Sequence, residues 1–297
     1  MTPTFSVVVA TRDRPRDLER CLAALRTQQG PVLELIVVDD GSTDGDAVRR
    51  EAERAGAMLV VQPPLGVAAA RNSGAGRAST PYVAFVDDDS EPMPNWAALL
   101  MDRLAAGAVA VAGPVVANGA GGQLGLASQL AANCLIDRDA HTASRTVYGP
   151  GANLACRMDV LRSIPFDESY SGIGAEDRDW CARLAKHGVA LTFEPAAKVW
   201  HNQKLTLAEF CRRQYRYGRG AQVYRARHEQ SRLETPGFYA KVIADGFRVG
   251  PVVGLLVCVA QVATAAGYLR ELLAGRSRRT SGASRRTESQ AKNRAAS

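Results

Sequence analysis

The sequence lacks closely spaced cysteines, internal repeats and a secretory leader. Its six cysteines lie far apart, at positions 21, 134, 156, 181, 211 and 258, so neither a zinc site nor a disulfide framework is indicated. No signal-peptide pattern precedes the first apolar run, residues 5–10. From these absences we expect a reducing, cytosolic setting for the folded part.

The overall composition is that of an ordinary globular protein, but the charge is unevenly placed. The 297 residues allow one large or two modest domains, with 46% hydrophobic and 23% charged residues. The formal net charge is +7, and residues 270–297 alone contain eight Lys or Arg and two Glu. Such a basic end suits lipid headgroups or nucleic acid, unless it is a solvated, disordered end.

Short apolar runs alternate with helical patterns along the first half of the chain. Buried strands are predicted at residues 5–10, 34–38, 58–61, 82–86 and 108–112. Helices are predicted from Pro15 onward, near 44–56 and near 66–78. This order predicts an α/β fold, a Rossmann-like and mostly parallel sheet with helices on both faces.

Two of the predicted strands end in acids. Asp39 and Asp40 follow residues 34–38, and a run of three Asp, residues 87–89, follows residues 82–86. Ligands bind outside the carboxyl ends of the strands in such sheets, so we expect these acids to share a site. Residues 40–51 also match an EF-hand calcium loop, but a strand precedes them where a helix is needed, and the match is interpreted as accidental.

Three adjacent carboxylates, those of Asp87, Asp88 and Asp89, repel one another unless a cation neutralises them or water solvates them. Their place after a buried strand favours a divalent cation shared with substrate phosphates, and the alternative is a solvated acidic turn. Arg71, on a helix rich in Gly and Ala, is either a partner of a phosphate or carboxylate or a surface residue.

Two further candidates lie later in the chain. Glu176 and Asp177 begin a predicted helix after a glycine-containing loop, where they serve either as a general base facing a cleft or as acids that favour the helix N-terminus. His201 follows a short strand-like run and is either a metal ligand beside the acid cluster or a structural histidine.

Seven segments in this order resemble the family 2 glycosyltransferases, which have the GT-A fold. They lie within about residues 5–202 and read VVVATRDR, VVDDGSTD, GVAAARNSG, FVDDDSEPMP, GPGANLACR, GAEDRDWCARL and VWH. Each segment alone is a weak signal, whereas the ordered set is specific. The resemblance implies a transferase that takes a nucleotide-sugar donor and a divalent metal, Mn²⁺ or Mg²⁺.

The resemblance also implies roles for the candidate residues. Those matching nucleotide-sugar contacts, or the turn that supports them, are Thr11, Asp39, Asp40, Arg71, Asp87 and Asp88. Those matching metal ligands are Asp87, Asp89 and His201. Asp177 matches the catalytic base, with Glu176 beside it in the acceptor site. The QxxRW pattern of processive members is absent, because Tyr215, Arg216 and Tyr217 follow Gln214, so transfer of one or a few sugars is expected.

The last third of the chain carries basic and apolar segments. Residues 205–232 mix seven Arg with four aromatic residues, which suits a surface helix, an interfacial helix or one that covers the acceptor site. We do not expect nucleic acid to be a binding partner. Residues 249–269 carry no formal charge and are long enough to span a bilayer. A single span would separate the catalytic domain from the basic end, which should stay cytoplasmic. We therefore expect a re-entrant or interfacial helix at the cytoplasmic face, and the alternative is a buried helix of a soluble protein.

The predicted organisation has four parts: a glycosyltransferase domain at 1–204, a basic and aromatic helical extension at 205–246, an apolar membrane-associated helix at 247–270 and a disordered tail at 271–297. The predicted function is inverting, metal-dependent and non-processive sugar transfer to a glycan or lipid-linked acceptor in cell-envelope synthesis. The alternatives are a sugar-nucleotide-forming nucleotidyltransferase, for which the glycine-rich loop after the first strand is missing, and a non-catalytic sugar-nucleotide-binding protein.

Overall fold

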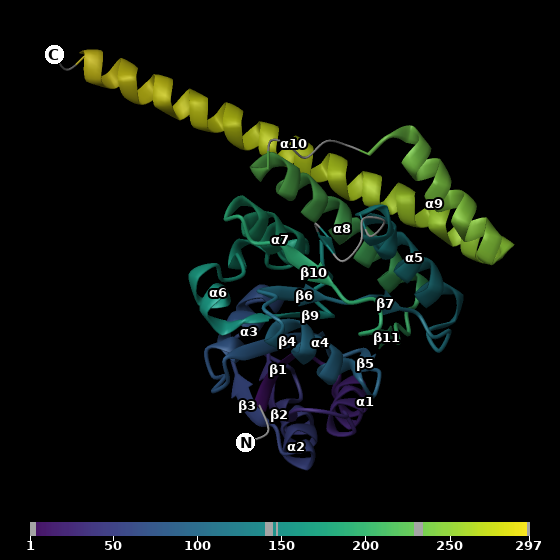
Figure 1. Ribbon diagram of the computed structural model, residues 1–297. Coiled ribbons are helices and arrows are strands. Elements are labelled where there is room, and N and C mark those ends of the chain that lie inside the picture. The colour runs from purple at the N-terminus through teal and green to yellow at the C-terminus, as the bar shows by residue number, and fades with distance from the viewer. Residues whose placement is uncertain (1–3, 140–144, 147, 229–233, 296–297) are drawn as a thin grey trace.

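A mixed sheet of eight strands forms the centre of the molecule (Figure 1). The computed structural model describes residues 4–139, 145–146, 148–228 and 234–295. In the order β3-β2-β1-β4-β9-β6-β10-β8, the strands are Met58–Val61, Val32–Asp39, Thr4–Thr11, Tyr82–Asp87, Leu154–Arg157, Ala110–Ala112, Leu191–Phe193 and Arg145–Thr146. β1 pairs in parallel with β2 and β4, whereas β9 is antiparallel to both β4 and β6. The predicted α/β fold with a mostly parallel sheet is confirmed, and the antiparallel β9 is an addition to it.

Helices cover both faces of this sheet because its central strands are apolar on both sides. Along β1, the side chains of Val7 and Val9 enter one buried cluster and that of Val8 enters the other. The first cluster is closed by α1 (Pro15–Arg26), α2 (Gly45–Ala55) and α4 (Trp96–Ala105). The second is closed by α3 (Val67–Ala75), α6 (Met158–Ser163) and α7 (Glu176–Lys186).

Strand register brings the ends of three strands to one level. Thr11 at the end of β1 lies opposite Asp39 at the end of β2. Ala10 of β1 lies opposite Asp87, the last residue of β4. A smaller sheet beside this edge has the order β5-β11-β7, with strands Ser90–Pro92, Val199–His201 and Val115–Val116. The acids that follow β2 and β4 therefore meet at one edge, together with the end of β11.

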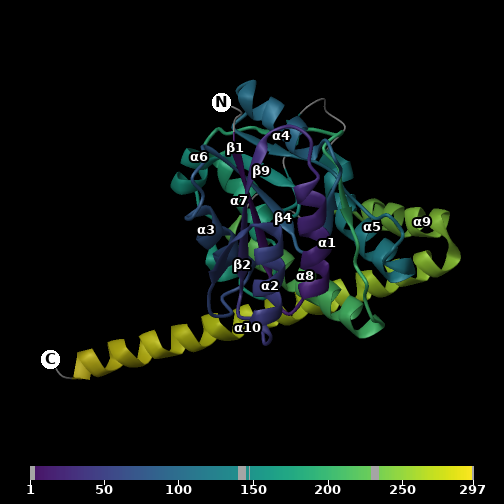
Figure 2. The ribbon, with the colours of Figure 1, turned by 90° about the horizontal axis from the view of Figure 1, so that it is seen from below.

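A layer of helices covers this edge (Figures 1 and 2). Its members are α5 (Gly122–Asp139), α8 (Leu207–Arg227), α9 (Pro236–Val249) and α10 (Pro251–Ala295). Outside this layer, a short 3-10 helix, η1 (Glu168–Tyr170), packs against α3. Their shared apolar cluster includes Phe210, Val242 and Val257. The apolar stretch is divided at Gly250 between α9 and α10, and α10 continues as helix through residue 270. The four-part division of the chain stays a prediction.

Glycines allow α8 to touch its neighbours backbone to backbone. A Cβ on Gly218 of α8 would overlap the carbonyl oxygen of Thr264 in α10, and one on Gly267 of α10 would overlap that of Tyr215 in α8. On another face of α8, a Cβ on Gly220 would lie 2.7 Å from the carbonyl oxygen of Gly174, in the loop before α7. The helix is therefore held between α10 and that loop at distances that only glycine permits.

We expect Gly218→Ala to lower the free energy of unfolding by about 1–3 kcal/mol, because the added methyl group must separate α8 from α10. Gly237→Ala is the matched control, since the nearest atom to its added Cβ is 3.9 Å away. That change should leave the melting temperature equal or slightly higher, as alanine favours helix. Thermal unfolding followed by circular dichroism compares the two, and equal melting temperatures would contradict the close packing.

Candidate active site

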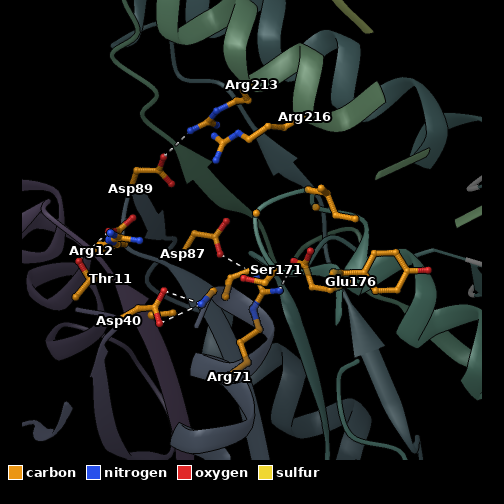
Figure 3. A pocket seen from close by; sticks show the side chains of 18 of the residues that line it. Thr11, Arg12, Asp40, Arg71, Asp87, Asp89, Ser171, Glu176, Arg213 and Arg216 are labelled. Atoms are coloured by element: carbon orange, nitrogen blue, oxygen red, sulfur yellow. Dashed lines mark hydrogen bonds and ion pairs between the residues drawn. The ribbon is translucent and has the colours of Figure 1, made fainter. Parts of the chain in front are cut away.

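A cavity of about 470 Å³ opens where the strand ends meet the helical layer (Figure 3). Its walls come from the ends of β1 and β4, the start of α3, the loop at 170–174 and one face of α8. The acids, arginines and histidine that line it are Arg12, Asp13, Arg14, Asp40, Arg71, Asp87, Asp88, Asp89, Glu176, His201, Arg213 and Arg216. Acids and arginines thus share one open cavity, the size of which suits a small organic ligand.

Arg71 joins two acids from distant parts of the chain. Its guanidinium donates to Asp87 at 2.9 Å and to Glu176 at 2.8 Å, and it is almost fully buried. Gly151 makes this possible, because a Cβ there would lie 2.5 Å from both Nη atoms of Arg71. The prediction left open whether Arg71 is a surface residue, and the structure places it inside the cavity wall between two carboxylates.

Asp88 contacts β1 and shares Arg14 with Asp89. Its carboxylate accepts a hydrogen bond from Thr11 Oγ1 at 2.8 Å and one from Arg14 at 3.1 Å. Burial and the charge of Asp89 raise the pKa of Asp88 to about 7, although Arg14 opposes the shift. Thr11 is buried at the edge of the cavity, and its hydroxyl holds the carboxylate of Asp88.

Asp87, Asp89 and His201 form a group that suits a cation. One ligand atom from each lies within 4.8 Å of the others, and His201 Nε2 is 2.7 Å from Asp89 Oδ1. Burial raises the pKa of Asp89, but His201, Arg213 and Arg14 outweigh it and hold that pKa well below its ordinary value. Two carboxylates and an imidazole fit Mn²⁺ well, with room for phosphate oxygens and water in the remaining positions. The structure thus brings the three predicted ligands together, which is consistent with a divalent metal cofactor.

The acids after β2 hold two turns. Asp40 borders the cavity and accepts hydrogen bonds from the backbone N–H groups of Leu65 at 2.8 Å and Gly66 at 2.9 Å. Asp39 is buried behind the wall and accepts from the N–H of Ser42 at 2.9 Å. Asp40 thus fixes the loop that leads to α3, and Asp39 supports its own turn, as the resemblance implies.

Glu176 and Asp177 differ in position although they are adjacent. Glu176 is buried in the cavity wall, where burial and the charge of Asp177 raise its pKa to about 7 against the effect of Arg71. Asp177 is half-buried outside the wall and accepts from Tyr148 Oη at 3.0 Å and from the N–H of Gly151 at 2.9 Å. The residue before them, Ala175, has φ +74°, a left-handed conformation that costs a non-glycine residue energy and turns the chain into α7.

Four arginines that line the cavity were not among the predicted site residues: Arg12, Arg14, Arg213 and Arg216. Arg14 contacts Asp88 and Asp89, and Arg213 lies 3.7 Å from Asp89. Arg216 lies at the exposed mouth of the cavity, and no carboxylate within the described part of the chain pairs with it. Partial desolvation and the charge of Arg213 lower the pKa of Arg216, yet a guanidinium stays charged. Arg12 and Arg14 lie in the segment VVVATRDR, and Arg213 and Arg216 lie in the Arg-rich stretch at 205–232, but only the fold shows that they line the same cavity.

Comparison with known proteins gives relatives along most of the chain. Pre-mycofactocin glycosyltransferase of Mycobacterium tuberculosis is 32% identical over 236 residues, which are 75% of this chain and 48% of that protein. Glycosyltransferase AglE of Haloferax volcanii is 27% identical over 229 residues, 73% of each chain. The chain spans about half the length of the mycobacterial relative.

Solved structures show the same fold. The mannosyltransferase PcManGT from Pyrobaculum calidifontis, in complex with GDP-Man and Mn²⁺, has a TM-score of 0.59 and 22% identity, with 96% of this chain and 80% of that chain covered. Glucosyl-3-phosphoglycerate synthase from Mycobacterium tuberculosis has a TM-score of 0.55 and 22% identity, with 79% and 82% covered. The family model described as glycosyl transferase family 2 matches residues 6–164, more than half of the chain. The chain therefore belongs to glycosyl transferase family 2, a family of glycosyltransferase enzymes, as its ordered motifs predict.

Proposed function

We propose that this protein transfers a sugar from a nucleotide-diphosphate donor to an acceptor hydroxyl, with inversion at the anomeric carbon. One observation carries the proposal. The candidate cation ligands Asp87, Asp89 and His201 line the same cavity as Arg216, and Arg216 has no carboxylate partner in the described chain. Cation and guanidinium together match the charges of a diphosphate. Two proteins of the same fold were solved with Mn²⁺ and a nucleoside diphosphate or its sugar.

The donor is proposed to lie along the strand ends. Thr11 and Asp40 border the part of the cavity nearest β1 and α3, where the nucleoside is expected, with Asp39 as support. Asp87, Asp89 and His201 would hold a divalent cation, Mn²⁺ or Mg²⁺, which neutralises charge developing on the leaving diphosphate.

Arg213 and Arg216 approach the same volume from α8 and are proposed to hold the diphosphate oxygens from the other side (Figure 3). Arg71 is proposed to keep its two acids in place, because it already pairs with Asp87 and Glu176. A fixed array of positive groups around the leaving group lowers the barrier to its departure.

Asp177 does not itself line the cavity, but it directly follows Glu176 of the cavity wall, and it is proposed as the base that takes the proton of the acceptor hydroxyl as this oxygen attacks the anomeric carbon. Its carboxylate has no ion pair within the described chain, whereas Glu176 is committed to Arg71. A single displacement inverts the anomeric configuration. Because α8 closes one side of the cavity and the QxxRW pattern is absent, non-processive transfer is proposed, to a glycan or lipid-linked acceptor of the cell envelope.

We further propose that α9 and α10 dock on the cytoplasmic face of a membrane. One helical segment in the described chain, Pro251–Ala274, is long and apolar enough to cross a bilayer, with mean hydropathy 2.0. Its exposed side chains include Leu255 at 61% and Val262 at 71%, and Arg248 and Arg270 flank the apolar stretch. A spanning helix would have to leave α8, against which α10 packs through Gly218. An interfacial or re-entrant position keeps that contact.

Asp177→Asn is expected to lower kcat about 10²–10⁴-fold and to leave nucleotide-sugar binding intact, since it removes the proton acceptor. Glu176→Gln, the neighbouring control, should mainly raise the KM of the donor, because Arg71 loses a partner. Steady-state kinetics and donor titration separate the two. Two results together would identify Glu176 as the base instead. One is loss of kcat in Glu176→Gln, and the other is a wild-type rate that rises with pH through about 7, where the pKa of Glu176 lies.

Arg216→Gln is expected to weaken binding of a nucleotide-diphosphate sugar about tenfold, or about 1.4 kcal/mol, because one charge facing the diphosphate is lost. Arg212→Gln is the matched control, since Arg212 is an exposed arginine of the same helix that does not line the cavity. Isothermal titration with UDP-, GDP- and dTDP-sugars in the presence of Mn²⁺ measures both. Equal affinities for the two variants, or binding that a chelator does not change, would contradict this arrangement.

Leu255→Glu is expected to reduce binding to vesicles of anionic lipid at least about tenfold, since burial of one leucine contributes roughly 1.5–3 kcal/mol. Val61→Glu is the control, because Val61 on β3 is also 61% exposed and lies outside the helical layer. Vesicle flotation compares them with the wild type. Complete release of the protein from membranes by alkaline carbonate would rule out the re-entrant form and leave surface docking.

A further inference from the structure

Gln129 contacts the ring nitrogen of His201 that does not face Asp89. It lies on α5, its side chain is 5% exposed, and its Oε1 is 2.7 Å from His201 Nδ1. The opposite ring nitrogen, Nε2, is the one that faces Asp89 Oδ1 at 2.7 Å. A helix that precedes β11 by about 60 residues therefore contacts His201, the one member of this candidate ligand group that is not a carboxylate.

The orientation of the Gln129 amide is determined by its other contacts. Its Nε2 lies 3.2 Å from the carbonyl oxygen of Val115 and 2.7 Å from Asn133 Oδ1. Asn133 donates its own Nδ2 to the same Val115 oxygen at 2.9 Å, which turns its Oδ1 toward Gln129. A carbonyl oxygen only accepts, so the nitrogen of the Gln129 amide must face Val115 and its oxygen must face His201.

We propose that Gln129 is a positioning residue for the cation site. Its oxygen accepts only, so Nδ1 of His201 carries a hydrogen, and Nε2 would be left to offer its lone pair to a cation held with Asp87 and Asp89. Ligating histidines are commonly held in this way through the second ring nitrogen. The ring plane is fixed as well, because Val115 and Asn133 hold the amide.

Gln203 is the competing candidate for this role. Its amide nitrogen approaches Nδ1 of His201 at 2.8 Å and Nε2 at 3.0 Å. Its Oε1 is buried without a hydrogen-bond partner among the described residues, so no contact decides which end of the amide faces the ring. Gln129 has that fixed orientation and Gln203 does not.

The inference rests on the proposed cation-dependent function, and the test measures Mn²⁺ binding instead of turnover. The full-length chain is titrated with Mn²⁺, and the free ion is followed by electron paramagnetic resonance. Gln129→Met, which keeps the volume but removes the acceptor, should weaken Mn²⁺ binding about 10–100-fold. Gln214→Met is the matched control, because Gln214 is an equally buried glutamine on α8 that contacts Ser128. It should bind Mn²⁺ as the wild type does.

Gln129→Glu and a measurement on the wild type keep the inference testable if Gln129→Met does not fold. Gln129→Glu keeps an acceptor for Nδ1–H and should retain most of the Mn²⁺ affinity. In the ¹⁵N spectrum of the wild type, which has four histidines, His201 should carry its hydrogen on Nδ1 when Mg²⁺ is bound, with Nε2 shifted by the ion. His201→Ala identifies the signal.

The outcomes separate the inference from the function on which it rests. Wild-type Mn²⁺ affinity in Gln129→Met, a loss of affinity in Gln203→Met alone, or a hydrogen on Nε2 of the Mg²⁺-bound wild type would each overturn the role of Gln129. Wild-type affinity in His201→Ala would overturn it too, while leaving a site formed by the two carboxylates. Absence of Mn²⁺ binding by the wild type would overturn both the inference and the cation-dependent function.

Discussion

Repulsion among three consecutive carboxylates at the end of one buried strand is the constraint that orders the site. Like charges at this spacing and depth cannot all stay ionised without nearby positive groups. The chain sends the acids at 87–89 in different directions, each to a partner from another element: Arg71 from α3, Arg14 from the start of α1 and His201 from β11. The site is therefore complete only when the sheet, its flanking helices and the small sheet have assembled around β4.

The ion pairs of these acids also affect how a cation and a donor bind. Under the proposed function, a cation held by Asp89 would compete with Arg213 for that carboxylate. The guanidinium of Arg213 would then be available to an incoming diphosphate. Cation and donor would thus favour each other's binding through residues already present in the cavity.

Local pattern was enough to predict β1, β2, β3, β4 and β6 and the acids that follow β2 and β4, because a doubly buried strand leaves an uninterrupted apolar run and acids just past it have one edge to occupy. Three features needed the tertiary structure. Residues 154–157 are too short and ordinary to reveal an antiparallel central strand. Arg213 and Arg216 enter the cavity only because α8 crosses above it, about 125 residues after the acids they face. The contact between Gln129 and His201 joins residues 72 positions apart, and no periodicity marks it.

Backbone contact between α8 and α10 also limits how the cavity can change shape. Side chains between two helices act as a deformable layer that lets one slide over the other, and here Gly218 and Gly267 remove that layer. On another side, Gly220 brings α8 close to the loop before α7. Arg213 and Arg216 therefore lie on a helix that can shift little against either neighbour, so the wall of the cavity that α8 forms keeps its shape.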